Sequence, residues 1–470
     1  MVFYLKWAFV KMQRRYERIK EMERERLGSR LGFILLSAGC AIGVGNVWKF
    51  PYMTGQYGGG AFVLVYLLCL VLLGVPVMTM EFALGRASQK SPVKLYDKLA
   101  PKGSKWKIHG YAAMVANYIL MFFYTIVTGW MLRYFVDMAA GKFVGASVEE
   151  VGNMFGAMMS QPVALIVYMA IVVALGILIC SMGVQKGVEK ISKPMMIALL
   201  VIMVILAVNS VFLPGAAEGV KFYLIPDVGR MMDIGFAEVV TGAMNQSFFT
   251  LSLGIGSMAI FGSYIGKERS LMGEAVNVAV LDTFVALCAG MIIFPACFAY
   301  GVQPDSGPNL IFVTLPNIFN NIPLGRVWGS LFFVFMSFAA FSTIIAVFEN
   351  IIAMCMDLFG WDRKKACIIN AAVLFFGSIP CALGFNVWSD FAIAGKGIMD
   401  LEDFAVSNLL LPLGSLTYVL FCVSRYGWGW DKFVAEANEG KGLKVAKWMR
   451  PFMTFVIPAL ILVIFVMGII

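Results

Sequence analysis

The sequence predicts an all-α protein that crosses a membrane about eleven times. Hydrophobic residues make up 60% of its 470 residues and charged residues only 14%, which is typical of multi-spanning membrane proteins. Apolar runs long enough to cross a bilayer, which takes about 20 residues, recur along the whole chain. Two of these runs contain closely spaced glycines, which weaken a helix and free backbone groups that lipid cannot satisfy. We therefore expect helical spans, two of which are broken.

The positions of the apolar runs define the expected spans. We place them at residues 31–52, 60–85, 110–138, 162–182, 194–214, 236–265, 274–301, 327–358, 366–386, 399–424 and 450–470. Several exceed the minimum length, so we expect tilt or extension beyond the bilayer. The loops are too short for a second folded domain. We therefore divide the chain into an amino-terminal segment, 1–30, and one transmembrane domain, 31–470.

Basic residues predict the orientation of the spans. Lysines and arginines gather before the first span, after the second, after the fourth and after the eighth, at 6–30, 86–107, 186–193 and 363–365. Loops rich in lysine and arginine remain in the cytoplasm. The amino terminus is therefore expected inside, and an odd number of spans places the carboxyl terminus outside. No signal-peptide pattern precedes the first span, so we expect that span to direct insertion.

Several classes of function have no support in the sequence. The net charge of +9 reflects the orientation of the protein in the membrane and not nucleic-acid binding. The basic leader is interleaved with glutamates, as in a solvated helix. The nine cysteines form no CxxC pair and lie mostly within spans, so we expect neither disulfides nor a zinc site. His109 is the only histidine, and no P-loop or HExxH motif is present. We expect neither an enzyme, nor an ATP-driven pump, nor a nucleic-acid-binding protein.

The two glycine-broken segments, 38–46 and 248–256, lie in the first and sixth expected spans. One interrupted span in each half of the chain is typical of transporters that bind substrate and ions near the membrane midplane. The alternative is that these glycines serve only close packing between helices.

Polar residues inside the spans are few, and each needs a partner or water. Sodium requires about five or six oxygen ligands, which carbonyls of an unwound helix and polar side chains can supply. The candidate side chains are Asn46, Thr250, Asp282, Ser342 and Thr343. A single hydroxyl in a membrane helix more often bonds the carbonyl of the preceding turn, which is the structural alternative for each.

The motifs resemble those of the neurotransmitter:sodium symporter family, in particular its short bacterial amino-acid transporters such as the leucine transporter. The resemblance rests on GCAIGVGNVWKFP at 39–51, GGGAF at 58–62, Glu81, FFTLSLGIG at 248–256 and FAAFSTIIAV at 338–347. It implies an inverted repeat of five plus five spans, at 31–214 and 236–424, with a peripheral helix at 450–470.

The resemblance also implies two sodium sites and a substrate site. The first sodium would bind the Ala41 carbonyl, Asn46, Thr250, Asp282 and the substrate carboxylate. The second would bind the carbonyls of Gly39, Ile42 and Ala339 and the hydroxyls of Ser342 and Thr343. The substrate site would comprise Cys40, Ala41, Val44, Gly45, Leu120, Tyr124, Phe249, Thr250, Ser252, Ile255, Thr343 and Val347.

The implied substrate is a neutral, hydrophobic amino acid, since a charged side chain would be buried there without a partner. Chloride-dependent relatives generally carry Asn at the position of Asp282 and Ser at that of Ala286. The carboxylate of Asp282 and the missing hydroxyl at Ala286 therefore imply transport without chloride. The alternative is that Asp282 is only a hydrogen-bonded packing residue.

The gates implied by the resemblance lie on both sides of the site. Lys49 and Asp403 would form the outer pair, with lysine where arginine is more usual, which gives a weaker, less bidentate latch. Arg24, Tyr264 and Asp357 would close the inner side. In the fifth span, Gly187 precedes Pro194 by seven positions instead of the usual nine, so an opening role for that helix is less secure.

Taken together, these inferences predict a symporter in the cytoplasmic membrane of a bacterium that couples uptake of an amino acid to two sodium ions. The alternatives are a sodium-coupled carrier of a small osmolyte or amine, and an amino-acid sensor that does not transport. A channel is disfavoured by a closed midplane site with paired gates. The sequence does not specify which amino acid binds or the oligomeric state.

Overall fold

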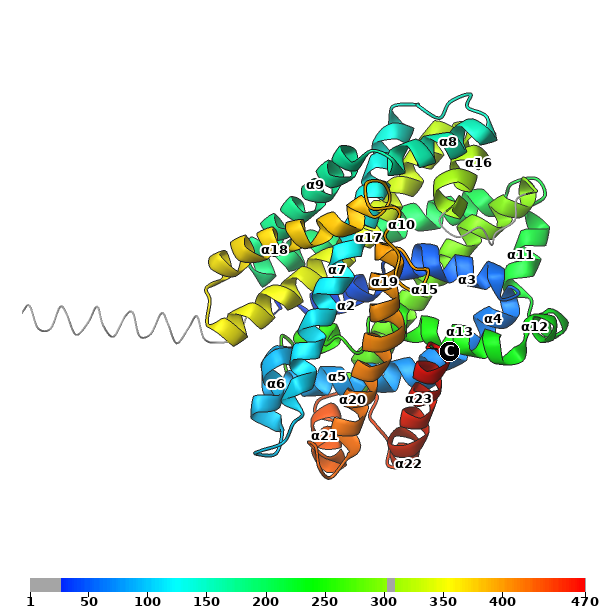
Figure 1. Ribbon diagram of the computed structural model, residues 1–470. Coiled ribbons are helices and arrows are strands. Elements are labelled where there is room, and N and C mark those ends of the chain that lie inside the picture. The colour runs from blue at the N-terminus through cyan, green and yellow to red at the C-terminus, as the bar shows by residue number, and fades with distance from the viewer. Residues whose placement is uncertain (1–26, 302–308, 470) are drawn as a thin grey trace, which may run out of the picture.

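The computed structural model describes residues 27–301 and 309–469, and these residues form helices and turns without a β-strand (Figure 1). The all-α class is therefore confirmed. Nine helices in the described ranges are long and apolar enough to cross a membrane: Gly60–Ser88 (α4, η2, α5), Lys107–Ala139 (α7), Pro162–Ser181 (α9), Val184–Val211 (η3, α10), Leu271–Ala299 (α15), Gly325–Phe359 (α17), Arg363–Leu383 (α18), Ile398–Val423 (α19, η5, α20) and Met449–Met467 (α22, η6, α23).

Two further spans are broken, as the glycine-rich segments predict. In the first, α2 (Arg30–Ala41) is followed by the π-helical turn η1 (Gly45–Lys49) and α3 (Phe50–Gln56), with a bend of 55°. In the second, six residues, 251–256, separate α13 (Phe236–Thr250) from α14 (Ser257–Gly262). With these two, the described helices are consistent with the eleven spans expected.

The fifth span differs from the prediction at its amino-terminal end. We expected it to begin at 194, but helical structure begins at Val184, and Pro194 lies inside α10 (Lys190–Val211). The residues before Pro194 are largely polar, so hydropathy alone did not assign this part of the helix to the span. Glu189 in this part is satisfied, because it accepts hydrogen bonds from the Gly28 amide at 2.7 Å and the Ser29 hydroxyl at 3.0 Å.

Short helices outside the spans were not predicted, because none carries a long apolar run. They are α6 (Pro92–Leu99), α8 (Val148–Met159), α11 (Ala216–Leu224), α12 (Val228–Ile234), α16 (Leu315–Asn320) and α21 (Trp430–Ala437). Figure 1 shows α6 and α21 at one end of the helix bundle and α8, α11 and α16 at the opposite end.

The first broken span lies in the middle of the bundle. It packs against α10, α15 and α17, and α17 in turn packs against α7 (Figure 1). Residues 32 to 47 of this span are buried almost without exception. The backbone groups that the break frees therefore face protein, which is the only environment in which a membrane segment tolerates them.

A buried ion pair ties α5 (Val75–Ser88) to α21 and should contribute strongly to stability. The fully buried Arg86 side chain contacts the Glu436 carboxylate at 2.6 Å and the Arg269 carbonyl at 2.7 Å. Replacing Arg86 by Met removes the nearest cation from the largely buried Glu436 carboxylate, which keeps only Lys267 at 3.8 Å, and we expect the free energy of unfolding to fall by about 3 kcal/mol. Arg230→Met, which breaks a solvent-exposed pair with Asp227, should change it by less than about 0.5 kcal/mol. Unfolding in mixed micelles measures both, and equal effects would contradict this interpretation.

Candidate functional site

The first helix break turns backbone carbonyls toward α17. At Ile42 the chain leaves the helix with φ −71° and ψ 97°. The Thr343 hydroxyl then lies 3.3 Å from the Gly39 carbonyl, 3.4 Å from that of Cys40 and 3.3 Å from that of Ile42. The Ser342 hydroxyl donates to the Ile42 carbonyl at 3.1 Å. The break therefore gathers oxygen atoms from two spans at one point.

The second break is held open by side chains from other spans. Residues 252, 254 and 256 have positive φ angles of 51°, 93° and 78°, and Gly254 leaves no room for a Cβ, which would lie 2.2 Å from the Leu411 carbonyl. The Gly254 amide donates to the Glu81 carboxylate at 2.6 Å, and the Asn117 amide group donates to the Ile255 carbonyl at 2.8 Å. Freed backbone groups on both sides of the break thus have partners.

The two breaks are in direct contact. The Ser252 hydroxyl donates to the Cys40 carbonyl at 3.1 Å, and the Gln246 amide group donates to the Gly45 carbonyl at 2.8 Å. On the far side of the first break, the Val44 amide donates to the Tyr124 hydroxyl at 2.8 Å. Backbone donors and acceptors of both broken spans therefore surround a common point.

A small cavity of about 20 Å³ lies at this point, room for about one water molecule. Among the described residues no charged side chain lines it; its walls are Cys40, Ala41, Gly43, Gly45, Leu120, Tyr124, Phe249, Ser252, Ile255, Thr343 and Leu411. Of the residues expected here, Val44, Thr250 and Val347 do not line the cavity. Gly43 and Leu411 were not expected. The site is contracted in this structure.

The side chains expected at the first sodium site form one buried cluster. The Asn46 amide group donates to the Asp282 carboxylate at 2.8 Å, and the Thr250 hydroxyl lies 3.2 Å from the same carboxylate. All three side chains are buried. The cluster combines one negative charge with neutral oxygen donors, which suits a hard monovalent cation.

The groups expected at the second sodium site also converge. Ser342 and Thr343 lie on α17 and face the carbonyls of Gly39 and Ile42, while the Ser342 hydroxyl contacts the Ala339 carbonyl at 2.8 Å. These five oxygens come from α17 and from the first break. The carbonyls of Gly39 and Ile42 are available because the helix is interrupted. In a continuous helix they would accept hydrogen bonds from amides of the same helix.

The expected outer pair is present. The Lys49 ammonium lies 3.5 Å from the Asp403 carboxylate and 3.3 Å from the Ser407 hydroxyl. It also lies over the Phe249 ring, 3.9 Å from the ring centroid, within the range of a cation–π interaction. Lys49 thus connects the charged pair to the aromatic ring that covers the cavity.

Two residues expected at the inner gate, Tyr264 and Asp357, form hydrogen bonds with residues that were not expected there. The Tyr264 hydroxyl donates to the buried Glu349 carboxylate at 2.8 Å, and Arg363 binds the same carboxylate at 2.7 and 3.0 Å. Asp357 accepts a hydrogen bond from the Ser91 amide at 2.7 Å. Arg24, the third expected member, lies outside the described residues.

Several residues that shape the site carried too weak a signal in the sequence. Glu81 stood out as a charge inside a span, but its role in holding the second break emerges only from the packing of α5 on α14. Asn117 and Gln246 are buried amides in spans. The rule that intramembrane polar residues need partners would have singled them out as well.

Comparisons with known proteins agree with this geometry. A model described as "Sodium:neurotransmitter symporter family" matches residues 24–154 and 148–470. The "Uncharacterized sodium-dependent transporter YhdH" of Bacillus subtilis (strain 168) is 35% identical over 449 residues, which cover 95% of this chain and 98% of the relative. The "Sodium- and chloride-dependent taurine transporter" of Rattus norvegicus is 24% identical over 490 residues, which cover 94% of this chain and 77% of the relative.

A solved structure, described as "Crystal structure of MhsT in complex with L-phenylalanine", superposes with a TM-score of 0.86. It is 38% identical in sequence, and the match covers 95% of this chain and 100% of MhsT. A family match over nearly the whole chain and a shared fold with two broken spans lead to one conclusion. The chain belongs to the sodium:neurotransmitter symporter family and is a sodium-dependent membrane symporter, not an enzyme.

Proposed function

We propose that the protein imports a neutral, hydrophobic amino acid by alternating access, in the cytoplasmic membrane and with its amino terminus inside. The observation that carries this proposal is the meeting of two helix breaks at a cavity without charged side chains. The breaks supply amide donors on one side and carbonyl acceptors on the other. The ammonium and carboxylate groups of an α-amino acid are the same distance apart whatever its side chain, so one pair of binding points serves many side chains.

The polar ends of the substrate have separate partners in this proposal. The carboxylate binds the amides of Val44 and Gly45 and the Tyr124 hydroxyl, at the start of the helical segment η1, where backbone N–H groups favour an anion. The ammonium binds carbonyls near Ala41 and at the end of α13, together with Ser252. The Val44 to Tyr124 contact of 2.8 Å places two of these donor groups side by side.

The side chain of the substrate would contact an apolar wall. Leu120, Phe249, Ile255 and Leu411 border the cavity, and a charged or strongly polar side chain would lose its hydration there without gaining a partner. The similarity to MhsT, whose structure is described with L-phenylalanine, supports a hydrophobic amino acid. Because the cavity holds only about 20 Å³, binding must expand it by moving the walls apart.

Two sodium ions accompany the substrate in this proposal. The first binds Asn46, Thr250, Asp282 and the Ala41 carbonyl, and its last ligand is the substrate carboxylate. The second binds at Ser342 and Thr343 and fastens the first break to α17. Ion and substrate binding are therefore coupled, since each completes or stiffens the site of the other.

We further propose that transport needs no chloride. Asp282 places a fixed negative charge within 3.2 Å of Thr250 and 2.8 Å of Asn46, where it neutralises the first sodium. Ala286 lies four residues later on α15, on the same face of the helix. It offers no hydroxyl to bind an anion. A mobile chloride would add a second negative charge beside the carboxylate, which like-charge repulsion opposes.

Uptake into proteoliposomes tests the proposed function. We expect the purified protein to accumulate hydrophobic amino acids from a labelled mixture of the twenty when an inward sodium gradient is imposed, and not under a potassium gradient. Accumulation of taurine or betaine in preference to every amino acid would favour an osmolyte carrier. Sodium-dependent binding without accumulation would favour a sensor, and flux without coupling to sodium would favour a channel. Each of these results would overturn the proposal.

The second sodium site can be removed with one double variant. Ser342→Ala with Thr343→Ala deletes both side-chain ligands while leaving the carbonyls in place, so sodium-driven accumulation should be abolished. Ser337→Ala on the same helix, whose hydroxyl bonds only the Phe333 carbonyl of its own helix, should transport normally. Thermal unfolding in detergent verifies that both variants fold. Unchanged sodium affinity in the double variant would contradict the assignment.

The negative charge beside the first sodium can be moved from the protein to a dissolved anion. Asp282→Asn with Ala286→Ser removes the fixed charge and adds a hydroxyl, so the double variant should require chloride. The wild type and Ala286→Ser alone should transport equally in chloride and in gluconate, because both keep the carboxylate. Uptake rates in the two anions give the answer. Chloride stimulation of the wild type would refute this prediction.

A further inference from the structure

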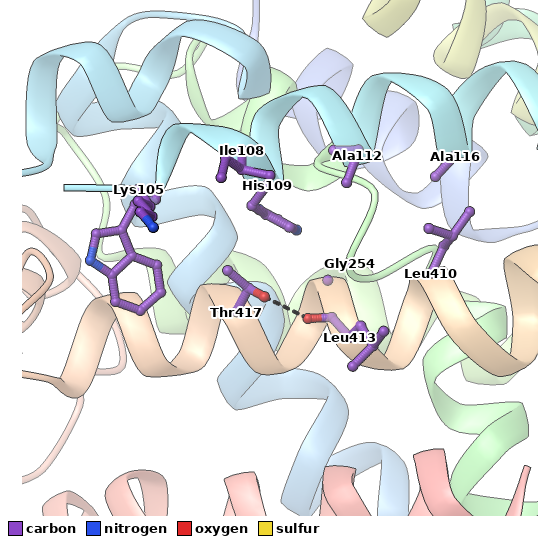
Figure 2. Close-up of a pocket in the computed structure, with 12 residues that line it drawn as sticks. Lys105, Ile108, His109, Ala112, Ala116, Gly254, Leu410, Leu413 and Thr417 are labelled. Carbon is purple, nitrogen blue, oxygen red and sulfur yellow. Dashed lines mark hydrogen bonds between the residues drawn. The ribbon is translucent and has the colours of Figure 1, made fainter. Parts of the chain in front are cut away.

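A groove much larger than the central cavity lies between α7 and α20 (Leu411–Val423). Its volume is about 470 Å³, against about 20 Å³ for the central cavity. Figure 2 shows α7 on one side of the groove, α20 on the other, and Gly254 of the second break between them. Neither the proposed substrate nor either sodium uses this space.

Small residues create the groove. On α7 its wall consists of Ala112, Ala113 and Ala116, and on α20 it includes Gly414. A Cβ at Gly414 would lie 2.1 Å from the Gly254 carbonyl, so the backbone of α20 rests directly on the second break. The floor of the groove is therefore the outer side of the same break that lines the substrate cavity.

The groove is open to the surroundings of the bundle, where lipid lies. Ile108 and Leu413, on opposite walls, are 60% and 39% exposed. Lys105 and Trp106 precede α7, and the wall on α7 itself runs from Ile108 to Ala116, a rise of about 12 Å at about 1.5 Å per residue. That length is somewhat less than half of the roughly 30 Å hydrocarbon core of a bilayer. The groove thus fits within one leaflet.

Its polar groups lie at one end. Lys105 belongs to the basic loop that we expect on the cytoplasmic side, and its neighbour Trp106 donates its indole N–H to the Tyr426 carbonyl at 2.8 Å. Tryptophan and lysine together are typical of the lipid headgroup level. The groove therefore begins at the cytoplasmic headgroups and ends near the membrane midplane.

His109 adds a hydrogen-bonding group between the headgroup level and the apolar wall. Its Nδ1 lies 2.7 Å from the Tyr96 hydroxyl. When Nδ1 accepts the tyrosine proton, Nε2 carries the proton of the neutral ring. Figure 2 shows the ring reaching from α7 toward Gly254 and α20, and His109 has a hydrogen-bonding interaction with the Gly254 backbone. His109 thereby links α7 to the second break at the floor of the groove.

We propose that this groove binds one anionic phospholipid of the cytoplasmic leaflet. Its phosphate pairs with Lys105, and an acyl chain lies between Ala112 and Leu413 with its end near Gly254. Lipid chemistry fits the groove in order: a negative charge beside Lys105, then hydrocarbon along the apolar wall. The bound chain would support the second break from outside, and this inference does not depend on which substrate occupies the inside.

Lipid retention measured by native mass spectrometry tests the proposal. The full-length protein is equilibrated in micelles with equal amounts of phosphatidylglycerol and phosphatidylcholine. We expect one phosphatidylglycerol retained per wild-type protein. Ala112→Phe fills the groove and should reduce retention at least tenfold. Ala174→Phe, the same change at an exposed alanine on α9, should retain lipid like the wild type. Equal retention by the two variants would overturn the proposal.

The headgroup contact needs its own pair of variants. Lys105→Gln should lower the preference for phosphatidylglycerol over phosphatidylcholine about fivefold, the contribution of one basic residue near an anionic surface. Lys102→Gln, in the same loop but outside the groove, should keep the preference. The proposal fails if the wild type retains both lipids equally or if glycerol phosphate alone displaces the lipid. It also fails if Ala112→Phe instead abolishes a dimer, which would assign the groove to a second copy of the chain. Thermal unfolding verifies the fold of each variant.

Discussion

Unpaired backbone groups in the middle of a membrane are the constraint on which this structure depends. Each break frees amides and carbonyls that a continuous helix would have bonded, and hydrocarbon offers them nothing. The freed groups are therefore met by side chains from distant spans: Ser342 and Thr343 at the first break, Glu81 and Asn117 at the second. The polar atoms needed to stabilise the breaks are of the same kind as those that bind sodium and the charged ends of an amino acid. Stability and binding thus draw on one set of groups.

Sharing these groups provides a physical basis for coupling. Thr343 already contacts three carbonyls of the first break, and Ser252 of the second break contacts a carbonyl of the first. Anything that binds between the breaks must replace such contacts and reset the distance between α2, α17 and the segment after α13. An ion and a substrate that replace neighbouring contacts influence each other without further machinery. The groove on the other side of Gly254 extends the same reasoning to the lipid, because its floor is the backbone of the second break.

Much of the architecture could be predicted from the sequence because membrane insertion depends on local composition. The ends of most spans agree with the hydropathy within a few residues, and both breaks lie where glycines interrupt apolar runs. The fifth span shows the limit. Its first turns are polar, and only the contacts of Glu189 with Gly28 and Ser29 explain why helix persists there. Similarly, Asn46, Thr250 and Asp282 stood out as polar residues in spans, whereas Asn117 and Gln246 did not, although they hold the breaks equally directly.

The sequence by itself determined the helical class, the spans, the two breaks and the residue types at the expected ion sites, since each follows from the cost of polar groups in lipid. Only the tertiary structure decided which groups meet. It placed Leu411 and Gly43 on the cavity wall and left Val347 outside it. It also set the backbone of α20 directly against Gly254, and a groove lies between α20 and α7. The physical reason is that packing between spans depends on the shapes of many side chains at once. Residues distant in sequence, such as Ser252 and Cys40, are brought together only by the packed bundle.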